Sequence, residues 1–259
     1  MSDNTNTTGL PFGGLQFKGP NPTPLDNRHE RTAILIGADA VKKLQQSSVA
    51  IFGVGGVGGA CAEALARMGV GAIELYDNDK VTLSNLNRQV VALHSTVGKY
   101  KVHVMAERIA DINPDCRVAG HTFYYMPDTA VLVPLDKYDY IIDAIDTVAA
   151  KVELAVRAKM AGVRIISAMG AGGKLDPMKF LVSDISKTET DPLARAVRKG
   201  LKERGLTKLK VVWSTEPPRN NLAGHIAPEG HRPPIGTTSC VPPACGLLLA
   251  TEVIKDLTR

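Results

Sequence analysis

Short apolar runs alternate along the chain with longer stretches whose apolar residues recur at helical spacing. Ser48–Phe52 and Ala72–Tyr76 are two such runs, each of the length expected for a buried β-strand. The stretch between them has the apolar pattern of a helix: Ala60, Ala62, Ala64, Leu65 and Met68. Together these segments predict one strand–helix–strand unit.

The same alternation continues to the C-terminus. One or two short helical segments suit residues 28–44, and further helices are expected at residues 101–112, 151–161 and 244–257. Further strands are expected at residues 116–124, 138–144, 163–167, 180–185 and 210–214. Alternating strands and helices are typical of a mostly parallel sheet with helices on both faces. The pattern predicts an α/β fold of the Rossmann-like, doubly wound class with a small C-terminal extension.

The chain divides into a tail and one large domain. Residues 1–27 are rich in Gly, Pro, Asn and Thr, which predicts a flexible N-terminal tail. Residues 28–259 form the domain, and residues 28–175 are its core. The remainder, residues 176–259, holds a basic segment, a loop rich in Pro, Gly and His that we expect to be mobile, and the closing helix.

Composition excludes several classes of protein. Apolar residues make up 44% of the chain and charged residues 22%, which is ordinary for a globular protein. No apolar stretch approaches membrane-spanning length and the N-terminus does not have the pattern of a secretory signal, so we expect a cytoplasmic protein without membrane association. The four cysteines form no C-x-x-C pair, so a structural zinc site is not expected.

A glycine-rich loop joins the first predicted strand to its helix. Gly53, Gly55, Gly56 and Gly58 lie in the run G-V-G-G-V-G. In this setting the first glycine permits a tight turn, the second lets phosphate oxygens approach the backbone, and Gly58 lets the helix pack against the strand. The N-terminus of that helix offers unpaired N–H groups to a phosphate. The loop therefore predicts a nucleotide site.

The second predicted strand ends at an acidic residue. Asp77 follows the loop by about twenty residues, where a carboxylate accepts hydrogen bonds from ribose hydroxyls. This arrangement suits NAD and ATP equally well.

The residues that follow favour ATP. Cleavage of a triphosphate between its α- and β-phosphates requires positive charge on the leaving pyrophosphate, and Arg88 and Lys101 are placed to supply it, with Asn85 as a neutral donor. Asp143 and Asp146 stand at the carboxyl end of another predicted strand, and one of them could hold Mg²⁺ together with phosphate oxygens.

These motifs resemble the E1-like superfamily, which includes ubiquitin-activating enzymes and the bacterial ThiF and MoeB proteins. The resemblance rests on the glycine loop, on D-x-D-x-V-x-x-S-N-x-N-R-Q from Asp77, on Gly98-x-x-Lys101, on I-N-P and on D-A-I-D. It implies ATP and Mg²⁺ binding, adenylation of a carboxylate and a homodimer. It also implies roles for particular residues: Asp77 on the ribose, Asn85, Arg88 and Lys101 on the phosphates, and Asp146 on the metal. We therefore expect Arg88, Lys101 and Asp146 to be the catalytic residues.

The resemblance also implies a contact between subunits. In relatives, an arginine before the first strand reaches the ATP of the partner subunit. Arg28 and Arg31 are both candidates for that role, and we favour Arg31.

A narrower resemblance covers nearly the whole chain. The runs G-A-G-G-x-x-D-P, K-T-x-x-D-P-L-A and S-T-E, among others, are similar to the TcdA group of bacterial tRNA threonylcarbamoyladenosine dehydratases. This implies an ATP-dependent ligase or cyclase that activates the threonyl carboxylate of a modified adenosine beside the tRNA anticodon and closes a ring. The basic segment from Lys187 to Lys210 would then contact tRNA phosphates.

Other functions remain open from the residues alone. The chain could instead activate the C-terminal glycine of a small ubiquitin-like sulfur-carrier protein, or be an NAD-dependent oxidoreductase or a nucleotide-binding scaffold. A sulfur-transfer partner protein is a further possibility.

Three further features of the sequence carry weaker signals: two cysteines, two histidines and a second glycine cluster. We expect Cys240 and Cys245 to be packing residues rather than nucleophiles. His225 and His231 have no identifiable partners and are expected at the surface. The second glycine cluster, Gly170–Gly173, fits either a tight turn or a wall near the reacting carboxylate.

Overall fold

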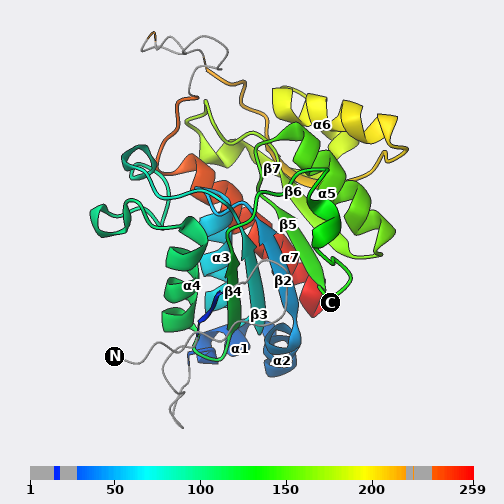
Figure 1. The fold of residues 1–259 in the computed structure, drawn as a ribbon. Coiled ribbons are helices and arrows are strands. Elements are labelled where there is room, and N and C mark those ends of the chain that lie inside the picture. The colour runs from blue at the N-terminus through cyan, green and yellow to red at the C-terminus, as the bar shows by residue number, and fades with distance from the viewer. Residues whose placement is uncertain (1–14, 18–27, 220–223, 225–234) are drawn as a thin grey trace.

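The computed structural model describes residues 15–17, 28–219, 224 and 235–259 (Figure 1). The strands are β1 (Leu15–Phe17), β2 (Ser48–Phe52), β3 (Ala72–Tyr76), β4 (Arg117–His121), β5 (Tyr140–Asp143), β6 (Arg164–Ala168), β7 (Phe180–Asp184) and β8 (Lys210–Ser214). The α-helices are α1 (Glu30–Ile36), α2 (Ala38–Gln46), α3 (Gly58–Arg67), α4 (Lys101–Ile112), α5 (Val148–Met160), α6 (Pro192–Glu203) and α7 (Val241–Thr258).

The strands form one mostly parallel sheet in the order β1-β4-β3-β2-β5-β6-β8-β7. The edge strands β1 and β7 run antiparallel to their neighbours. From β2 the chain order runs outward through β3 to β4, and on the other side it runs from β5 through β6 to β8. The loops that leave β2 and β5 therefore diverge, which opens a crevice at the carboxyl ends of these strands. The predicted α/β Rossmann-like class is confirmed.

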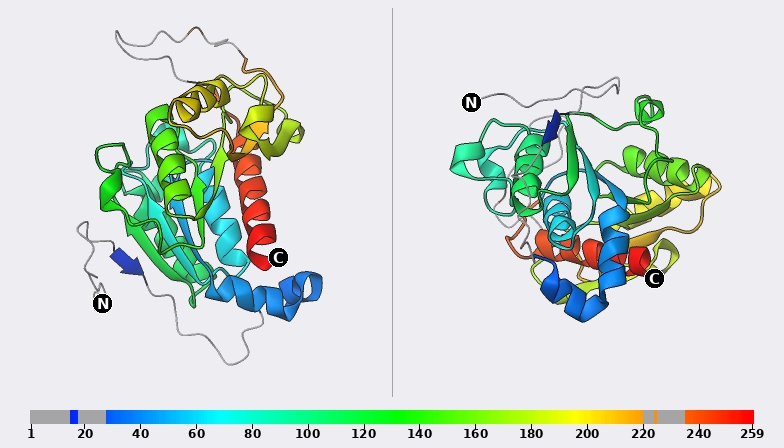
Figure 2. Two further views of the ribbon diagram at one scale, coloured as in Figure 1. Left: turned by 90° about the vertical axis from the view of Figure 1, so that its right-hand side faces the viewer. Right: turned by 90° about the horizontal axis from the view of Figure 1, so that it is seen from below.

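Helices cover both faces of the sheet (Figures 1 and 2). Along β2, Val49 and Ile51 join the apolar cluster that includes α3, α4 and α7, while Ala50 and Phe52 join the cluster that includes α5. All four side chains are fully buried, as expected for an interior strand of a parallel sheet. Helix α6 packs on α5 through Val197 and Leu201.

The C-terminal part of the chain completes this sheet. Strand β8 pairs in parallel with β6, and α7 packs against α3. At Gly246 of α7 the two helices come so close that a Cβ would lie 2.2 Å from the carbonyl oxygen of Val57. This contact places the start of α7 beside the glycine loop.

Three boundaries differ from the sequence-based expectations. Leu15–Phe17, within the predicted N-terminal tail, pairs with β4 and covers a sheet edge. The strand expected at residues 116–124 ends at His121. Helix α7 begins at Val241 because proline fits the first helical turn, where backbone N–H groups need no helical partner.

None of the helices in the described ranges combines the length and the apolar character needed to cross a bilayer.

Candidate active site

A cavity of about 530 Å³ opens at the crevice between β2 and β5. Its walls come from the carboxyl ends of β2, β3, β4, β5 and β6, together with the start of α7. The lining includes Gly53, Gly55, Gly56, Asp77, Asn85, Arg88, Lys101, Asp146 and Gly172. The structure thus brings nearly all the predicted site residues to one place, although they come from five different segments between Gly53 and Gly172.

The glycine loop adopts a backbone that side chains would disrupt. Gly53 has φ 90°, and a Cβ there would lie 2.6 Å from the Ala144 carbonyl oxygen. A Cβ on Gly58 would lie 1.8 Å from the Gly53 carbonyl oxygen, so the start of α3 can approach β2 only with glycine at this position. At Gly55, by contrast, the nearest atom would be 3.9 Å away. The loop therefore leaves space for a ligand at its middle glycine.

Asp77 stands between this loop and the segment after β3. Its Oδ2 accepts the N–H of Val54 at 2.7 Å and its Oδ1 accepts the N–H of Asp79 at 2.7 Å. Burial raises the pKa of the Asp77 carboxyl, while the Lys101 charge and these hydrogen bonds oppose the rise. Each carboxylate oxygen has a second lone pair, so both can still accept a ribose hydroxyl.

The cationic residues approach the cavity from the segment after β3 and from α4. Lys101 is the first residue of α4, and its Nζ lies 2.6 Å from the Asp79 carboxylate. Arg88 uses Nη1 to bind the carbonyl oxygen of Ser84 at 2.9 Å. Asn85 is buried, and its Oδ1 accepts the N–H of Thr82 at 3.2 Å. Two cations and an amide are thereby held on one wall of the cavity.

The structure separates the two aspartates of the D-A-I-D run. Asp143 is fully buried, with its Oδ2 bound by Lys151 at 2.9 Å and by the hydroxyl of Ser167. Its Oδ1 accepts the N–H of Ile145 at 3.1 Å. Asp146 is exposed and lines the cavity. Asp143 therefore supports the turn, and Asp146 is the carboxylate open to a metal.

Arg31 lies away from the cavity of its own chain. It is exposed on α1, at the end of the sheet opposite the glycine loop (Figure 1). Arg28 binds the side chain of Asn113 at 2.9 Å and lies 3.5 Å from the Asp115 carboxylate. Within the described part of the chain, Arg28 is thus tied to its own subunit, whereas the Arg31 side chain makes no hydrogen bond or ion pair there.

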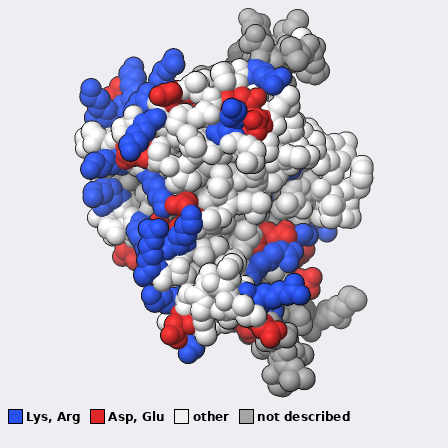
Figure 3. Space-filling model, turned by 180° about the vertical axis from the view of Figure 1, so that it is seen from behind, with Lys and Arg blue, Asp and Glu red and all other residues white. Residues whose placement is uncertain are grey.

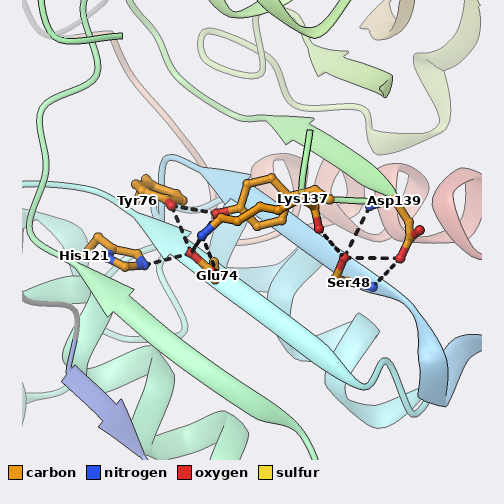
Figure 4. Close-up of polar contacts among 7 residues, drawn as sticks. Ser48, Glu74, Tyr76, His121, Lys137 and Asp139 are labelled. Carbon is orange, nitrogen blue, oxygen red and sulfur yellow. Dashed lines mark hydrogen bonds and ion pairs between the residues drawn. The ribbon is translucent and has the colours of Figure 1, made fainter. Parts of the chain in front are cut away.

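The floor of the cavity rests on an aromatic and polar cluster. Tyr76 stacks between Phe52 and His121, with ring centroids 4.6 and 4.5 Å apart. The Glu74 carboxylate accepts hydrogen bonds from His121, Tyr76, Tyr138 and Lys137, as Figure 4 shows. Burial alone would raise the pKa of Glu74, but the bonds from His121, Tyr138 and Lys137 lower it to about 2. An ionised Glu74 thus fixes the ring of Tyr76, which lines the cavity.

Sequence reasoning missed several residues of the cavity wall. Gln89 is 8% exposed and lines the cavity, and among the described residues its Oε1 has no hydrogen-bond partner. Tyr124 is 54% exposed at the same cavity. The position of Gln89 directly after Arg88 in the N-R-Q run could have predicted its place at the site. Tyr124 was missed because the preceding strand was predicted to end at residue 124 and ends at His121.

The predictions for the second glycine cluster, the cysteines and the histidines have different outcomes. Ala171 and Gly172 line the cavity and Gly173 has φ 71°, so the second glycine cluster is both a tight turn and a wall. Cys245 is buried, and burial raises its pKa to about 12. Cys240 is exposed at the start of α7, so the prediction that it packs is wrong. His225 and His231 lie outside the described residues.

Known proteins resemble this chain over most of its length. The tRNA threonylcarbamoyladenosine dehydratase of Bacillus subtilis is 40% identical over 242 residues, covering 90% of this chain and 95% of that protein. The corresponding Escherichia coli protein is 41% identical over 193 residues, covering 71% of this chain and 72% of the relative. These matches confirm the narrower resemblance seen in the motifs.

Solved structures give the same result. The E. coli dehydratase TcdA in complex with AMP matches with a TM-score of 0.81 at 35% identity, over 92% of this chain and 97% of that chain. Its complex with ATP matches with a TM-score of 0.79 at 36% identity, over 89% of this chain and 93% of that chain. The family model of the ThiF family matches residues 28–259. The chain belongs to the ThiF family.

Proposed function

We propose that the chain is a tRNA threonylcarbamoyladenosine dehydratase, which uses ATP to cyclise the threonylcarbamoyl side chain of a modified adenosine. The observation that carries the proposal is the single cavity in which the glycine loop, Asp77, two cations and Asp146 meet. Curated relatives of similar length carry this name, and a structural neighbour binds ATP.

In the first step, an oxygen of the threonyl carboxylate attacks the α-phosphorus of ATP and pyrophosphate leaves. Asp77 would hold the ribose, and the glycine loop would hold the α-phosphate near the start of α3. Arg88, Lys101 and Asn85 would bind the leaving pyrophosphate, where their charge and hydrogen bonds stabilise the transition state more than the ground state. Lys101 must turn from Asp79 to do so.

In the second step, a group within the same side chain attacks the activated carbonyl carbon. The ring closes, the attacking group loses its proton, and AMP leaves with one oxygen of the former carboxylate. The sum of both steps is loss of one water from the nucleoside, with ATP converted to AMP and pyrophosphate.

The residues also fit a magnesium ion. Asp146 is an exposed carboxylate at the cavity, and Mg²⁺ is held by one or two carboxylates together with phosphate oxygens. When bound, the ion would neutralise charge on the phosphates of ATP.

A homodimer would complete the site. Arg31 projects from α1 beside Ile34 and Leu35, which are 79% and 85% exposed. Such a pair of apolar side chains next to an arginine suits an interface in which Arg31 reaches the phosphates of the partner's ATP. Analytical ultracentrifugation would test the dimer. Arg31→Ala should lower activity, but it should leave the contacts between the protein and the ribose of the nucleotide unchanged.

The basic segment supplies a surface for tRNA. On the face shown in Figure 3, Lys and Arg gather along the side that carries α5 and α6. Arg195, Lys199 and Lys202 are exposed on α6 at i, i+4 and i+7, so they form one stripe. Within the described ranges, none of these three forms an ion pair. A stripe of free cations suits the phosphate backbone of RNA.

The test is mass spectrometry of nucleosides after tRNA that contains threonylcarbamoyladenosine is incubated with the protein, ATP and Mg²⁺. Loss of one water in the wild type and not in Arg88→Ala supports the proposal. No change of mass with the wild type removes it. Adenylation of a small protein that ends in Gly-Gly would then favour the sulfur-carrier activator. The cytoplasmic location and a sulfur-transfer partner stay predictions, which fractionation and pull-down would check.

A further inference from the structure

One wall of the cavity is held in place by a buried ion pair that lies outside it. The wall is the loop Gly170–Gly173, of which Ala171 and Gly172 face the cavity. Lys174 and Asp191 form the pair, with side chains 1% and 0% exposed and a separation of 3.3 Å. Neither residue lines the cavity, so the pair acts on the site only through what it holds.

The pair binds both backbone polar groups of Gly170. Asp191 Oδ2 accepts the N–H of Gly170 at 2.9 Å, and Lys174 Nζ donates to the carbonyl oxygen of Gly170 at 2.7 Å. A Cβ at position 170 would lie 3.1 Å from Asp191 Oδ2, so a glycine allows this close approach. The first residue of the wall is therefore fixed in position and in orientation by two charged groups.

The same carboxylate also holds the start of the basic helix. Asp191 is the N-cap of α6, and its Oδ1 accepts the N–H of Ala194 at 3.0 Å. The stripe of Arg195, Lys199 and Lys202 begins one residue further on. A single side chain thus joins the helix that carries free cations to the wall of the nucleotide cavity.

A purely structural role would not need these charges. An N-cap is provided equally well by Ser or Asn, and a buried ion pair contributes little to stability compared with apolar residues of similar volume. What the charged pair adds is simultaneous binding of the N–H and the C=O of Gly170. This favours precise placement of the wall as the role of the pair.

We propose that Asp191 is a positioning residue, which fixes the Gly170–Gly173 wall relative to α6 so that RNA held on α6 meets the cavity in a defined register. The proposal rests on the proposed function for its substrate. Asp191 would then affect the rate of the reaction and the protection of the wall by bound RNA, although it contacts neither ATP nor RNA.

The experiment compares the wild type with Asp191→Asn, the double variant Lys174→Met/Asp191→Asn and the control Asp184→Asn. Asp184 is also an N-cap, of the short helix Ile185–Lys187, but its carboxylate accepts the N–H groups of Ser186 and Leu209 rather than one from the wall. Calorimetry gives the affinity for ATP, filter binding the affinity for tRNA, and single-turnover kinetics the rate at saturation. Hydrogen exchange of residues 168–176 is measured with and without tRNA.

We expect Asp191→Asn to bind ATP and tRNA within about threefold of the wild type while the single-turnover rate falls about tenfold or more. The double variant should recover the thermal stability of the wild type but not its single-turnover rate. Asp184→Asn should retain the wild-type stability and the wild-type rate. A wild-type rate in Asp191→Asn, or recovery of the rate with stability in the double variant, would overturn the proposal.

Hydrogen exchange separates this proposal from the proposed function. If the wild type fails to dehydrate its tRNA, the proposed function fails. Protection of residues 168–176 by tRNA in the wild type, lost in Asp191→Asn, would still support the positioning role. Equal protection in both proteins, or none in either, would contradict it.

Discussion

Two lysine–aspartate pairs near the carboxyl ends of the strands have the same chemistry and opposite surroundings. Lys151 and Asp143 are both 0% exposed and lie 2.9 Å apart beneath the turn after β5. Lys101 and Asp79 lie 2.6 Å apart at the cavity, where the lysine side chain is 7% exposed and the aspartate side chain 61% exposed. The first pair is sealed from any ligand, whereas the second can open to admit one. Burial of the carboxylate, rather than residue type, therefore distinguishes the pair that supports the fold from the pair that can bind a ligand.

Removing the sealed lysine should have the largest effect. In Lys151→Met the Asp143 carboxylate loses its buried cation, so the free energy of unfolding should fall by about 3–5 kcal/mol. Denaturant unfolding followed by circular dichroism measures this loss. Lys151→Met/Asp143→Asn should recover much of it because no unpaired charge remains. A loss below about 1 kcal/mol in the single variant would mean that the buried pair does not support the fold.

Removing the open lysine should affect the reaction and leave the fold intact. We expect Lys101→Ala to lower kcat/KM about a hundredfold or more, because one cation is lost from the leaving pyrophosphate. The Lys101 side chain is only 7% exposed, so the free energy of unfolding should also fall, but by less than in Lys151→Met because the remaining Asp79 carboxylate is 61% exposed and stays solvated. Lys101→Arg is the matched control and should retain part of the activity. Wild-type kinetics in Lys101→Ala would show that the pair does not open onto the triphosphate.

The Glu74 cluster extends the comparison to an intermediate degree of burial. Glu74 has a pKa of about 2 in the fold against 4.5 for an ordinary glutamate, so its ionised form stabilises the protein above pH 4.5. That contribution is lost as the pH falls from 4.5 towards 2. Glu74→Gln should lower the free energy of unfolding at neutral pH by about 2 kcal/mol and flatten its pH dependence in this range. If the free energy of unfolding of Glu74→Gln fell with pH between 4.5 and 2 as steeply as that of the wild type, Glu74 would not be the group that titrates there.

The smallest effect is expected from the exposed partner of the open pair. Asp79→Asn removes the anion that competes with phosphate for Lys101, and the solvent around the 61% exposed Asp79 carboxylate weakens the pair to about 1 kcal/mol. We therefore expect ATP to bind about two- to fivefold more tightly, as measured by calorimetry, with the melting temperature unchanged. Weaker binding would assign Asp79 a direct role in holding the ligand.

The features that could be predicted from the sequence are those that depend on residues close together in the chain. The strand–loop–helix run around Gly53–Gly58 and the position of Asp77 depend on neighbours in the chain, and the fold class follows from their alternation. The role of Asp143 depends on Ser167, which is 24 residues away, and the Glu74 cluster depends on His121, which is 47 residues away. No local pattern reports such contacts. Exposure of Cys240 likewise depends on where α7 begins.

The most direct test of the account is the affinity of the cavity for two nucleotides. Calorimetric titrations with ATP–Mg²⁺ and with NAD⁺ should be made on the wild type and on Arg88→Ala/Lys101→Ala. If the cavity is an ATP site, the wild type binds ATP and not NAD⁺, and the double variant loses most of its affinity for ATP. Binding of NAD⁺ by the wild type, with affinity for ATP unchanged in the double variant, would contradict it.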